Sequence, residues 1–289
     1  MLEMVHDVTQ AGRYLTRILA GTDGSERATE SVRQAARLAA SFGADLILAY
    51  VIDSDRPHDD DVESDAERTL EAASAVARSL DVEPEALILS GDPGKTLVEH
   101  AEMDGVDLLC VGPDAGLLGG AIRVGRIAAH VLREARCSVL VARHAGPDFP
   151  KRIGCGVDGS QGSVDTALAA AALAAATGAE LRLVHVVPVF RGDNAEWTLD
   201  SDEASPPELE PSVAAASSHG VIPIREMAMG RPERALVITA ERDGADLVVV
   251  GHRGVHGVRR VLLGSVSEHV AHHASCSVIV VRTAGAAAG

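Results

Sequence analysis

Aromatic residues are scarce in this sequence, and the balance of charge is strongly acidic. Its 289 residues include one Trp, two Tyr and three Phe, and 42 acidic residues outnumber 26 basic ones, for a net charge of −16. Proteins that bind nucleic acids neutralise phosphates with Lys and Arg, and those that bind single strands stack the bases on aromatic rings. The composition therefore argues against a nucleic acid as a partner.

The sequence also has no closely spaced cysteines and no long apolar segment. Its four cysteines form no CxxC pair and show no zinc-ligand spacing, which favours a reducing compartment. Residues 1–14 contain acidic residues and no long apolar run, unlike a signal peptide. No apolar stretch in the sequence approaches the ~20 residues that a membrane helix needs. We therefore expect a cytoplasmic protein that has no membrane partner.

One unit is present twice along the chain. ILAGTDGS at Ile18–Ser25 is similar to IGCGVDGS at Ile153–Ser160, and CSVLVAR near the end of the first unit is similar to CSVIVVR at Cys276–Arg282. Matching residues are 135 positions apart up to the second strand of each unit and 139 apart from the third strand onwards. The duplication predicts two tandem domains, which we place at residues 1–146 and 147–289.

Each unit alternates short strands with helices. The strands are continuous runs of Val, Ile and Leu, which are typical of a parallel sheet covered by helices on both faces. We therefore predict an α/β protein with two tandem, doubly wound, five-stranded parallel sheets. Such sheets bind ligands beyond the carboxyl ends of their strands, at the point where the strand order reverses.

A long glycine-containing loop follows the fourth strand of the second unit. In GHRGVHGVRRVLLGS (Gly251–Ser265) the small residues Gly251, Gly254, Gly264 and Ser265 form the pattern G-x2-G-x9-G-S between a strand and a helix. Such a loop brings unpaired backbone N–H groups and a hydroxyl to the positive end of a helix, which is a phosphate-binding arrangement. The alternative is a flexible connector, but strand-to-helix loops normally need only about two to six residues.

Positive side chains in the same loop favour a polyanionic ligand. The basic residues of the loop are His252, Arg253, His256, Arg259 and Arg260. Their charge suits a triphosphate in an otherwise acidic chain, and ordinary solvated loop charge is the alternative for each of them. The loop is therefore the main candidate for a binding site.

The glycine motif, the two DGS turns, the strand-end sequence LVHVV and the closing CSVIVVR resemble the universal stress protein family, and the duplication resembles its tandem-domain form. The resemblance implies an adenine nucleotide alpha hydrolase-like fold with strand order 3-2-1-4-5 in each half. One subgroup of the family binds ATP. Its glycine loop holds the phosphates and ribose, and an Asp ending the first strand and a Val ending the second contact the base. The implied function is an ATP-binding regulator of the stress response.

Transferred residue by residue, the resemblance implies a cofactor site in the second half. Its members, with Arg253 added for its charge, are Asp158 and Val186 at the base and Gly251, Arg253, Gly254, Gly264, Ser265 and Val266 at the phosphates and ribose. Because order 3-2-1-4-5 reverses between the first and fourth strands, Asp158 and Gly251 should face one crevice. An Asx-turn within its own DGS segment is the alternative role for Asp158. The expected cofactor is ATP with Mg²⁺ or Mn²⁺, and the sequence does not separate ATP from ADP, AMP or a cyclic nucleotide.

The first half carries a weakened copy of this site. The motif positions hold Gly112, Ala115, Gly125 and Arg126, and the base positions hold Asp23 and Val51. Ala115 restricts the backbone, and Arg126 replaces the hydroxyl that would cap a phosphate, although an arginine can still pair with phosphate. We therefore expect two unequal sites, with the second half dominant.

The sequence offers little support for an enzyme. GDPGKT (Gly91–Thr96) is similar to a Walker A loop but has Leu89 where that pattern needs glycine, so we interpret it as a turn with Pro93 at the start of a helix. Without a Walker lysine or a carboxylate placed as a base, we expect at most slow ATP hydrolysis. The alternatives are a weak ATPase or adenylate-handling enzyme of the same fold and a nucleotide-free scaffold for protein partners.

The last strand of each half has an unprotected edge. Ser138–Arg143 and Ser277–Arg282 lack the charges or prolines that keep a free sheet edge from pairing. In the resembled family, such edges pair antiparallel between protomers. We predict that the two halves pair in this way within one chain, around a pseudo-twofold axis. A further homodimer and a regulatory protein partner are compatible with the sequence, but no feature identifies them.

Overall fold

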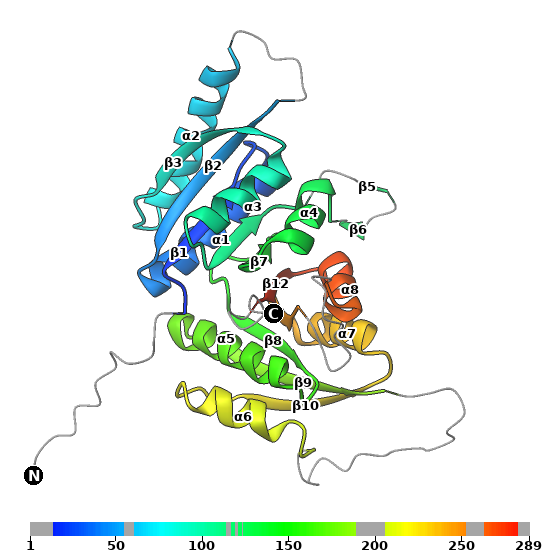
Figure 1. Cartoon of the computed structure of the whole chain (residues 1–289). Helices are drawn as coiled ribbons and strands as arrows, with labels where there is room; N and C mark the ends of the chain where they lie inside the picture. The colour runs from blue at the N-terminus through cyan, green and yellow to red at the C-terminus, as the bar shows by residue number, and fades with distance from the viewer. Residues whose placement is uncertain are drawn as a thin grey trace, which may run out of the picture.

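Strands and helices alternate along both halves of the chain in a computed structural model (Figure 1). The structure describes residues 14–54, 61–113, 117–118, 121–122, 124–188, 206–252 and 263–282. The first half contains β1 (Arg17–Gly21), α1 (Glu26–Phe42), β2 (Asp45–Asp53), α2 (Val62–Arg78), β3 (Glu85–Gly91), α3 (Pro93–Met103), β4 (Leu108–Val111), the short strands β5 (Leu117–Leu118) and β6 (Ala121–Ile122), α4 (Arg126–Glu134) and β7 (Ser138–Val141). The second half contains β8 (Arg152–Val157), α5 (Gln161–Thr177), β9 (Glu180–Val187), α6 (Glu210–Ser217), β10 (Ile224–Met229), α7 (Pro232–Asp243), β11 (Leu247–Gly251), α8 (Ser265–His273) and β12 (Ser277–Val281).

The long strands form one continuous sheet in the order β10-β9-β8-β11-β12-β7-β4-β1-β2-β3. Each half contributes five strands in the order 3-2-1-4-5, which confirms the predicted topology. Neighbouring strands within each half are parallel, whereas β7 and β12 pair antiparallel at the junction, with Val139 opposite Val280 and Val141 opposite Val278. The predicted pairing of the two edges is thus confirmed, and the two five-stranded sheets are halves of a single ten-stranded sheet.

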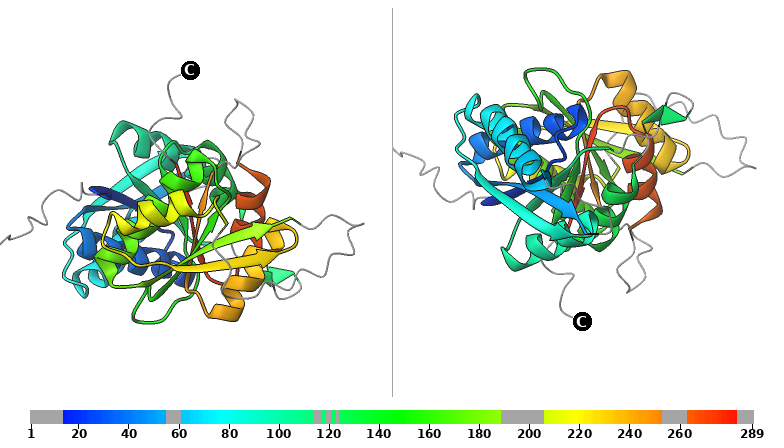
Figure 2. Two further views of the ribbon diagram at one scale, coloured as in Figure 1. Left: turned by 90° about the horizontal axis from the view of Figure 1, so that it is seen from below. Right: turned by 90° about the horizontal axis from the view of Figure 1, so that it is seen from above.

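Helices cover both faces of the sheet, and strand side chains alternate between two cores. Ile18 and Ala20 of β1 belong to the core beneath α1, α2, α5 and α6, whereas Leu19 belongs to the core beneath α3, α4, α7 and α8. Figure 2 shows helices of both halves on either side of the strands. This alternation follows from the two-residue period of a strand. Within the described ranges, no helix has the length and apolar character needed to cross a bilayer.

The DGS turns after β1 and β8 fix where the following helices begin. Ser25 and Ser160 are the N-caps of α1 and α5, and each hydroxyl accepts a hydrogen bond from an N–H group three residues further on. Asp23 and Asp158 accept the N–H groups of these serines, at 3.0 Å in each case. The end of each strand is thereby held against the start of a helix.

An arginine at the end of each half caps the last helix of the other half. Arg143 Nη1 donates to the Cys276 carbonyl at 3.1 Å, and Nη2 donates to the Ala271 carbonyl near the end of α8. Arg282 Nη2 donates to the Leu132 carbonyl near the end of α4, at 2.6 Å. Positive charge is favourable at helix C-termini, so this reciprocal pair stabilises both helices and joins the halves.

Burial distinguishes the two arginines. Arg143 is 1% exposed, and its burial lowers the pKa of the guanidinium to about 10. Its carbonyl accepts the Gln34 amide N–H at 2.5 Å, and its N–H donates to the Ser277 hydroxyl at 2.9 Å. The α5 residue equivalent to Gln34 is Ala169. The contact that Gln34 makes with the Arg143 carbonyl therefore has no counterpart at Ala169.

Candidate functional site

The sheet order of the second half reverses between β8 and β11, and the candidate base residues lie at the ends of these strands. The parallel register of β11 on β8, continued to the strand end, places Gly251 beside Val157, one residue before Asp158. The register of β9 on β8 places Val186 next to Asp158 on the other side. Asp158, Val186 and Gly251 therefore come together at the carboxyl edge, where doubly wound sheets bind ligands.

The start of α8 is joined to the end of β11. The Gly264 N–H donates to the His252 carbonyl at 2.8 Å, and the Ser267 hydroxyl donates to the Gly251 carbonyl. Gly264 is the N-cap residue, so no side chain caps the first N–H groups of α8. The positive end of the helix dipole lies there, which favours an anion. Four predicted phosphate and ribose residues gather in this corner: Gly251, Gly264, Ser265 and Val266.

Part of the predicted loop lies outside the described residues. This applies to Arg253 and Gly254 of the predicted site, to the basic residues His256, Arg259 and Arg260, and to Ala115 of the first half. Their roles stay predictions drawn from the sequence.

The Asp158 carboxylate has a structural partner in its own turn. Its Oδ1 accepts hydrogen bonds from the Ser160 N–H at 3.0 Å and from the Ser160 hydroxyl at 2.5 Å. The Asx-turn is therefore one role of this residue, and ligand binding stays a prediction for it. The turn therefore fixes the orientation of the Asp158 carboxylate at the end of β8.

A cavity of about 410 Å³ opens at the equivalent position of the first half. Asp23, Val51, Gly112 and Arg126 line it, at the ends of β1, β2 and β4 and the start of α4. Gly125 is the N-cap of α4 and directly precedes Arg126. The residues predicted for the weaker site thus gather around one cavity, whose volume falls in the range of about 300–1,000 Å³ seen for small-molecule sites.

Arg126 is held by an acidic partner beside this cavity. Its Nη1 lies 2.8 Å from Asp92 Oδ2, and Asp92 also caps α3 by accepting the Lys95 N–H at 3.0 Å. The hydrogen bond from Lys95, followed by the one from Arg126, lowers the pKa of Asp92 below its ordinary value. A phosphate at Arg126 would have to compete with this carboxylate, which supports the expectation of a weaker first-half site.

The second half has a different arrangement of charge at these two positions. The residues equivalent to Asp92 and Arg126 are Arg231 and Ser265. Arg231 is exposed at the N-cap of α7, and within the described part of the chain its side chain has no hydrogen-bond or ion-pair partner. In the first half, the short side chain of Asp92 and the long one of Arg126 together span the distance between the starts of α3 and α4. In the second half the long side chain is that of Arg231, which can therefore approach a ligand at Ser265. The sequence analysis did not single out Arg231, although the offset of 139 residues between the two halves aligns it with Asp92.

The histidine pair on α8 packs ring on ring. His269 and His273 have ring centroids 4.0 Å apart, and His273 Nδ1 lies 2.9 Å from the His269 carbonyl. Burial, and then the neighbouring His273, lowers the pKa of His269. Among the residues that the structure describes, no three His, Cys, Asp or Glu side chains come together as metal ligands. The metal that would accompany ATP therefore stays unassigned.

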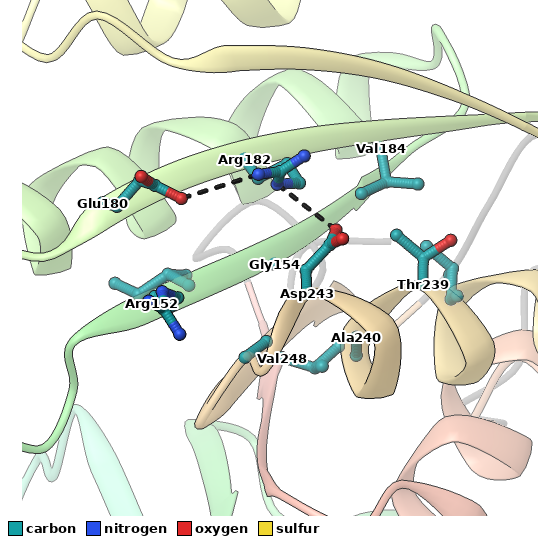
Figure 3. A pocket seen from close by; sticks show the side chains of 12 residues that line it. Arg152, Gly154, Glu180, Arg182, Val184, Thr239, Ala240, Asp243 and Val248 are labelled. Carbon is teal, nitrogen blue, oxygen red and sulfur yellow. Dashed lines mark ion pairs between the residues drawn. The ribbon is translucent and has the colours of Figure 1, made fainter.

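A much smaller pocket lies at the opposite edge of the second half (Figure 3). It has a volume of about 20 Å³ and lies beside the first residues of β8 and β9, at the amino ends of the strands. Arg182 points into it and lies 3.3 Å from Asp243 and 3.6 Å from Glu180. A volume of this size holds about one water molecule. The pocket is therefore too small for a nucleotide, and its ion pairs contribute to stability instead.

These ion pairs are expected to stabilise the fold above pH ~4. The hydrogen bond from Arg242, opposed by burial and supported by the charge of Arg182, lowers the pKa of Asp243. Because the folded pKa lies below the unfolded one, this stabilisation is present above the unfolded value and is lost as the pH falls through the folded value. Asp243→Asn should lower the free energy of unfolding by about 1 kcal/mol at neutral pH and progressively less in acid.

Urea unfolding at a series of pH values checks this prediction. Asp104→Asn is the matched control, because Asp104 is the first-half equivalent and its carboxylate faces His100 at 3.4 Å in place of two arginines. A loss of stability in Asp243→Asn that does not change with pH would contradict the prediction.

The fold and the site together define a class of protein. It is a duplicated, doubly wound α/β protein in which the residue after β11, His252, is hydrogen-bonded to the N-cap of α8, Gly264, at the carboxyl edge of the sheet. The Universal stress protein family matches this chain twice, over residues 15–143 and 150–282. The chain therefore belongs to the universal stress protein family, in a form that contains two family units.

Individual relatives agree with this assignment. Universal stress protein MJ0531 of Methanocaldococcus jannaschii is 38% identical over 144 residues, which cover 47% of this chain and 85% of that protein. Universal stress protein MT2698 of Mycobacterium tuberculosis is 28% identical over 299 aligned residues, covering 94% of this chain and 98% of that protein. A crystal structure of a universal stress protein from Archaeoglobus fulgidus covers 92% of this chain and 98% of its own, with a TM-score of 0.69 and 19% identity. This last likeness shows the shared fold.

Proposed function

We propose that the second half of this universal stress protein binds an adenine nucleotide, with ATP as the expected ligand. The observation that carries the proposal is the hydrogen bond from the Gly264 N–H to the His252 carbonyl at 2.8 Å. This contact holds His252 and Gly264, which flank the predicted loop, close together at the corner of the sheet beside Asp158. Occupancy of that corner would alter the surface formed after β8 and β11, and through it the binding of a regulatory partner in the stress response.

The residues of the corner suit the parts of such a ligand. The N–H groups at the start of α8 have no side-chain cap at Gly264, so they can donate to phosphate oxygens, and the Ser265 hydroxyl adds a donor. Val186 offers an apolar contact for the base at the end of β9. Asp158 offers carboxylate oxygens to the base amino group, to the ribose or to an accompanying Mg²⁺ or Mn²⁺.

Titration calorimetry of the full chain with ATP, ADP, AMP and cyclic AMP tests this proposal. We expect one tightly bound nucleotide per chain, since Arg126 in the first half is already paired with Asp92. Mass analysis of small molecules that co-purify identifies the form that is retained. Absence of saturable binding for all four nucleotides would contradict the proposal and would favour a nucleotide-free scaffold.

Arg231 is expected to contribute to the affinity for the phosphate chain. Arg231→Gln should weaken ATP binding about tenfold, or about 1.4 kcal/mol, because it removes an unpaired charge near Ser265. AMP has a single phosphate and should be affected less. Calorimetry with both nucleotides measures the difference. Arg225→Gln on β10 is the control, because it also removes one positive charge, but at a position away from the corner. Equal effects of the two substitutions on ATP affinity would show that Arg231 acts only through net charge.

A further inference from the structure

A second large cavity lies between α1 and residues 142–147, the segment that follows β7. Its volume is about 900 Å³, and it shares the lining residue Pro113 with the first-half cavity of about 410 Å³ described above. Its charged lining consists of Arg27, Arg33, Arg37 and Arg143 on the basic side and Glu26 and Glu30 on the acidic side. None of these charged residues lines the other cavity. The three arginines of α1 outnumber the two glutamates, so the lining carries net positive charge in a chain whose net charge is −16.

The charges inside this cavity are only partly paired. Glu30 is buried and forms an ion pair with Arg33, while the Arg143 guanidinium donates to main-chain carbonyls. The side chains of Arg27 and Arg37 have no hydrogen-bond or ion-pair partner among the described residues, and Arg37 Nε is buried without one. A buried donor without an acceptor costs about 1–3 kcal/mol. Among the described residues, the arginines of the lining therefore outnumber its carboxylates, and two of the arginine side chains have no partner.

The basic lining is specific to the first half. Arg27, Arg33 and Arg37 lie on α1, and α5 is the equivalent helix of the second half. The equivalent α5 residues are Gly162, Leu168 and Ala172. The duplicated fold therefore does not need arginines at these positions, so their presence in one copy points to a ligand.

We propose that this cavity binds a small polyanion that carries two or more phosphoryl groups. Arg27, Arg33 and Arg37 are spread over ten residues of α1, which corresponds to about 15 Å along the helix axis. Each phosphoryl group supplies several acceptor oxygens, and guanidinium groups bind phosphoryl oxygens through two parallel hydrogen bonds. Such a ligand would also contact residues 142–147, so its binding should stabilise the junction between the halves.

Inorganic tripolyphosphate, titrated into the full-length Gly264→Val variant, tests this proposal. That variant blocks the proposed nucleotide corner of the second half, and the arginine variants separate binding in the α1 cavity from binding at the first-half cavity lined by Arg126. At an ionic strength of about 0.15 M we expect saturable binding and a rise in melting temperature. Arg27→Gln and Arg37→Gln should each weaken the binding about tenfold, and Arg37→Lys, which keeps the charge but loses the planar fork, should have an intermediate affinity.

Arg68→Gln is the matched control. Arg68 is an exposed arginine of α2 that pairs with Asp65, away from the cavity, so its substitution should leave tripolyphosphate affinity unchanged. Absence of saturable binding, or equal affinity in all the arginine variants, would overturn the proposal. ATP binding is measured separately on the wild-type chain. Failure of the nucleotide proposal would therefore appear in that titration and not in this one.

Discussion

The Gly264→Val variant is expected to bind ATP at least about 100-fold more weakly than the wild-type chain, a loss of about 2.7 kcal/mol. Gly264 is the N-cap of α8, with φ −65° and ψ 146°, a conformation that valine also adopts readily. The substitution therefore adds a branched side chain at the helix start without straining the backbone. Phosphates must come within hydrogen-bond distance of the first N–H groups of α8, and the valine side chain would occupy that approach.

Gly125→Val provides the matched comparison for this experiment. Gly125 has the same N-cap position on α4, with φ −81° and ψ −176°, so the two substitutions make the same chemical change at equivalent places. Since the first half is expected to contribute little, this variant should lose at most about twofold in ATP affinity. Calorimetry measures both affinities, and circular dichroism confirms that both variants are folded. Equal losses in the two variants, or no loss in Gly264→Val, would contradict the assignment of the dominant site to the second half.

The two halves differ most where a phosphate would lie. In the first half, Arg126 and Asp92 neutralise each other at 2.8 Å, so a phosphate gains little from the guanidinium. In the second half, Arg231 and Ser265 occupy the same two positions and present one positive charge and one hydroxyl. The two copies thus share one fold but differ in the charge pattern at this position.

Local sequence patterns predicted where the strands lie, and the resemblance to the family supplied their order. The closing strands of the two halves lack protective charges, and the structure pairs them with Val139 opposite Val280. The interpretation of GDPGKT as a turn is also correct, because Asp92 caps α3 and Pro93 is its first residue. These features depend on segments of a few residues, whose apolar runs and turn chemistry can be read directly.

Long-range contacts could not be predicted in the same way. Arg126 and Asp92 are 34 positions apart, and Arg143 and Ala271 are 128 apart, so their pairing depends on how whole elements pack. The first-half cavity is a further example, since its volume depends on side chains from several strands and helices and not on the motif alone. The sequence thus predicted where the candidate residues gather but not which charges neutralise each other.

The Arg143→Met variant is expected to lower the free energy of unfolding by about 3 kcal/mol. Methionine keeps most of the length of the side chain but leaves the buried Ala271 and Cys276 carbonyls without their donors. Removing a buried charge also relieves desolvation, which is substantial because burial lowers the pKa of Arg143 to about 10. The lost charged hydrogen bonds and the two unpaired carbonyls together exceed this relief, so the net effect is destabilising.

Arg282→Met separates the effect of burial from that of helix capping. Arg282 caps α4 as Arg143 caps α8, but it is only partly buried, so water can replace its hydrogen bonds to the Leu132 carbonyl. We therefore expect a loss of about 1 kcal/mol for Arg282→Met. Urea unfolding of both full-length variants, followed by circular dichroism, measures the difference. A loss in Arg282→Met equal to or larger than that in Arg143→Met would show that helix capping, and not the burial of Arg143, accounts for the contribution of these arginines to stability.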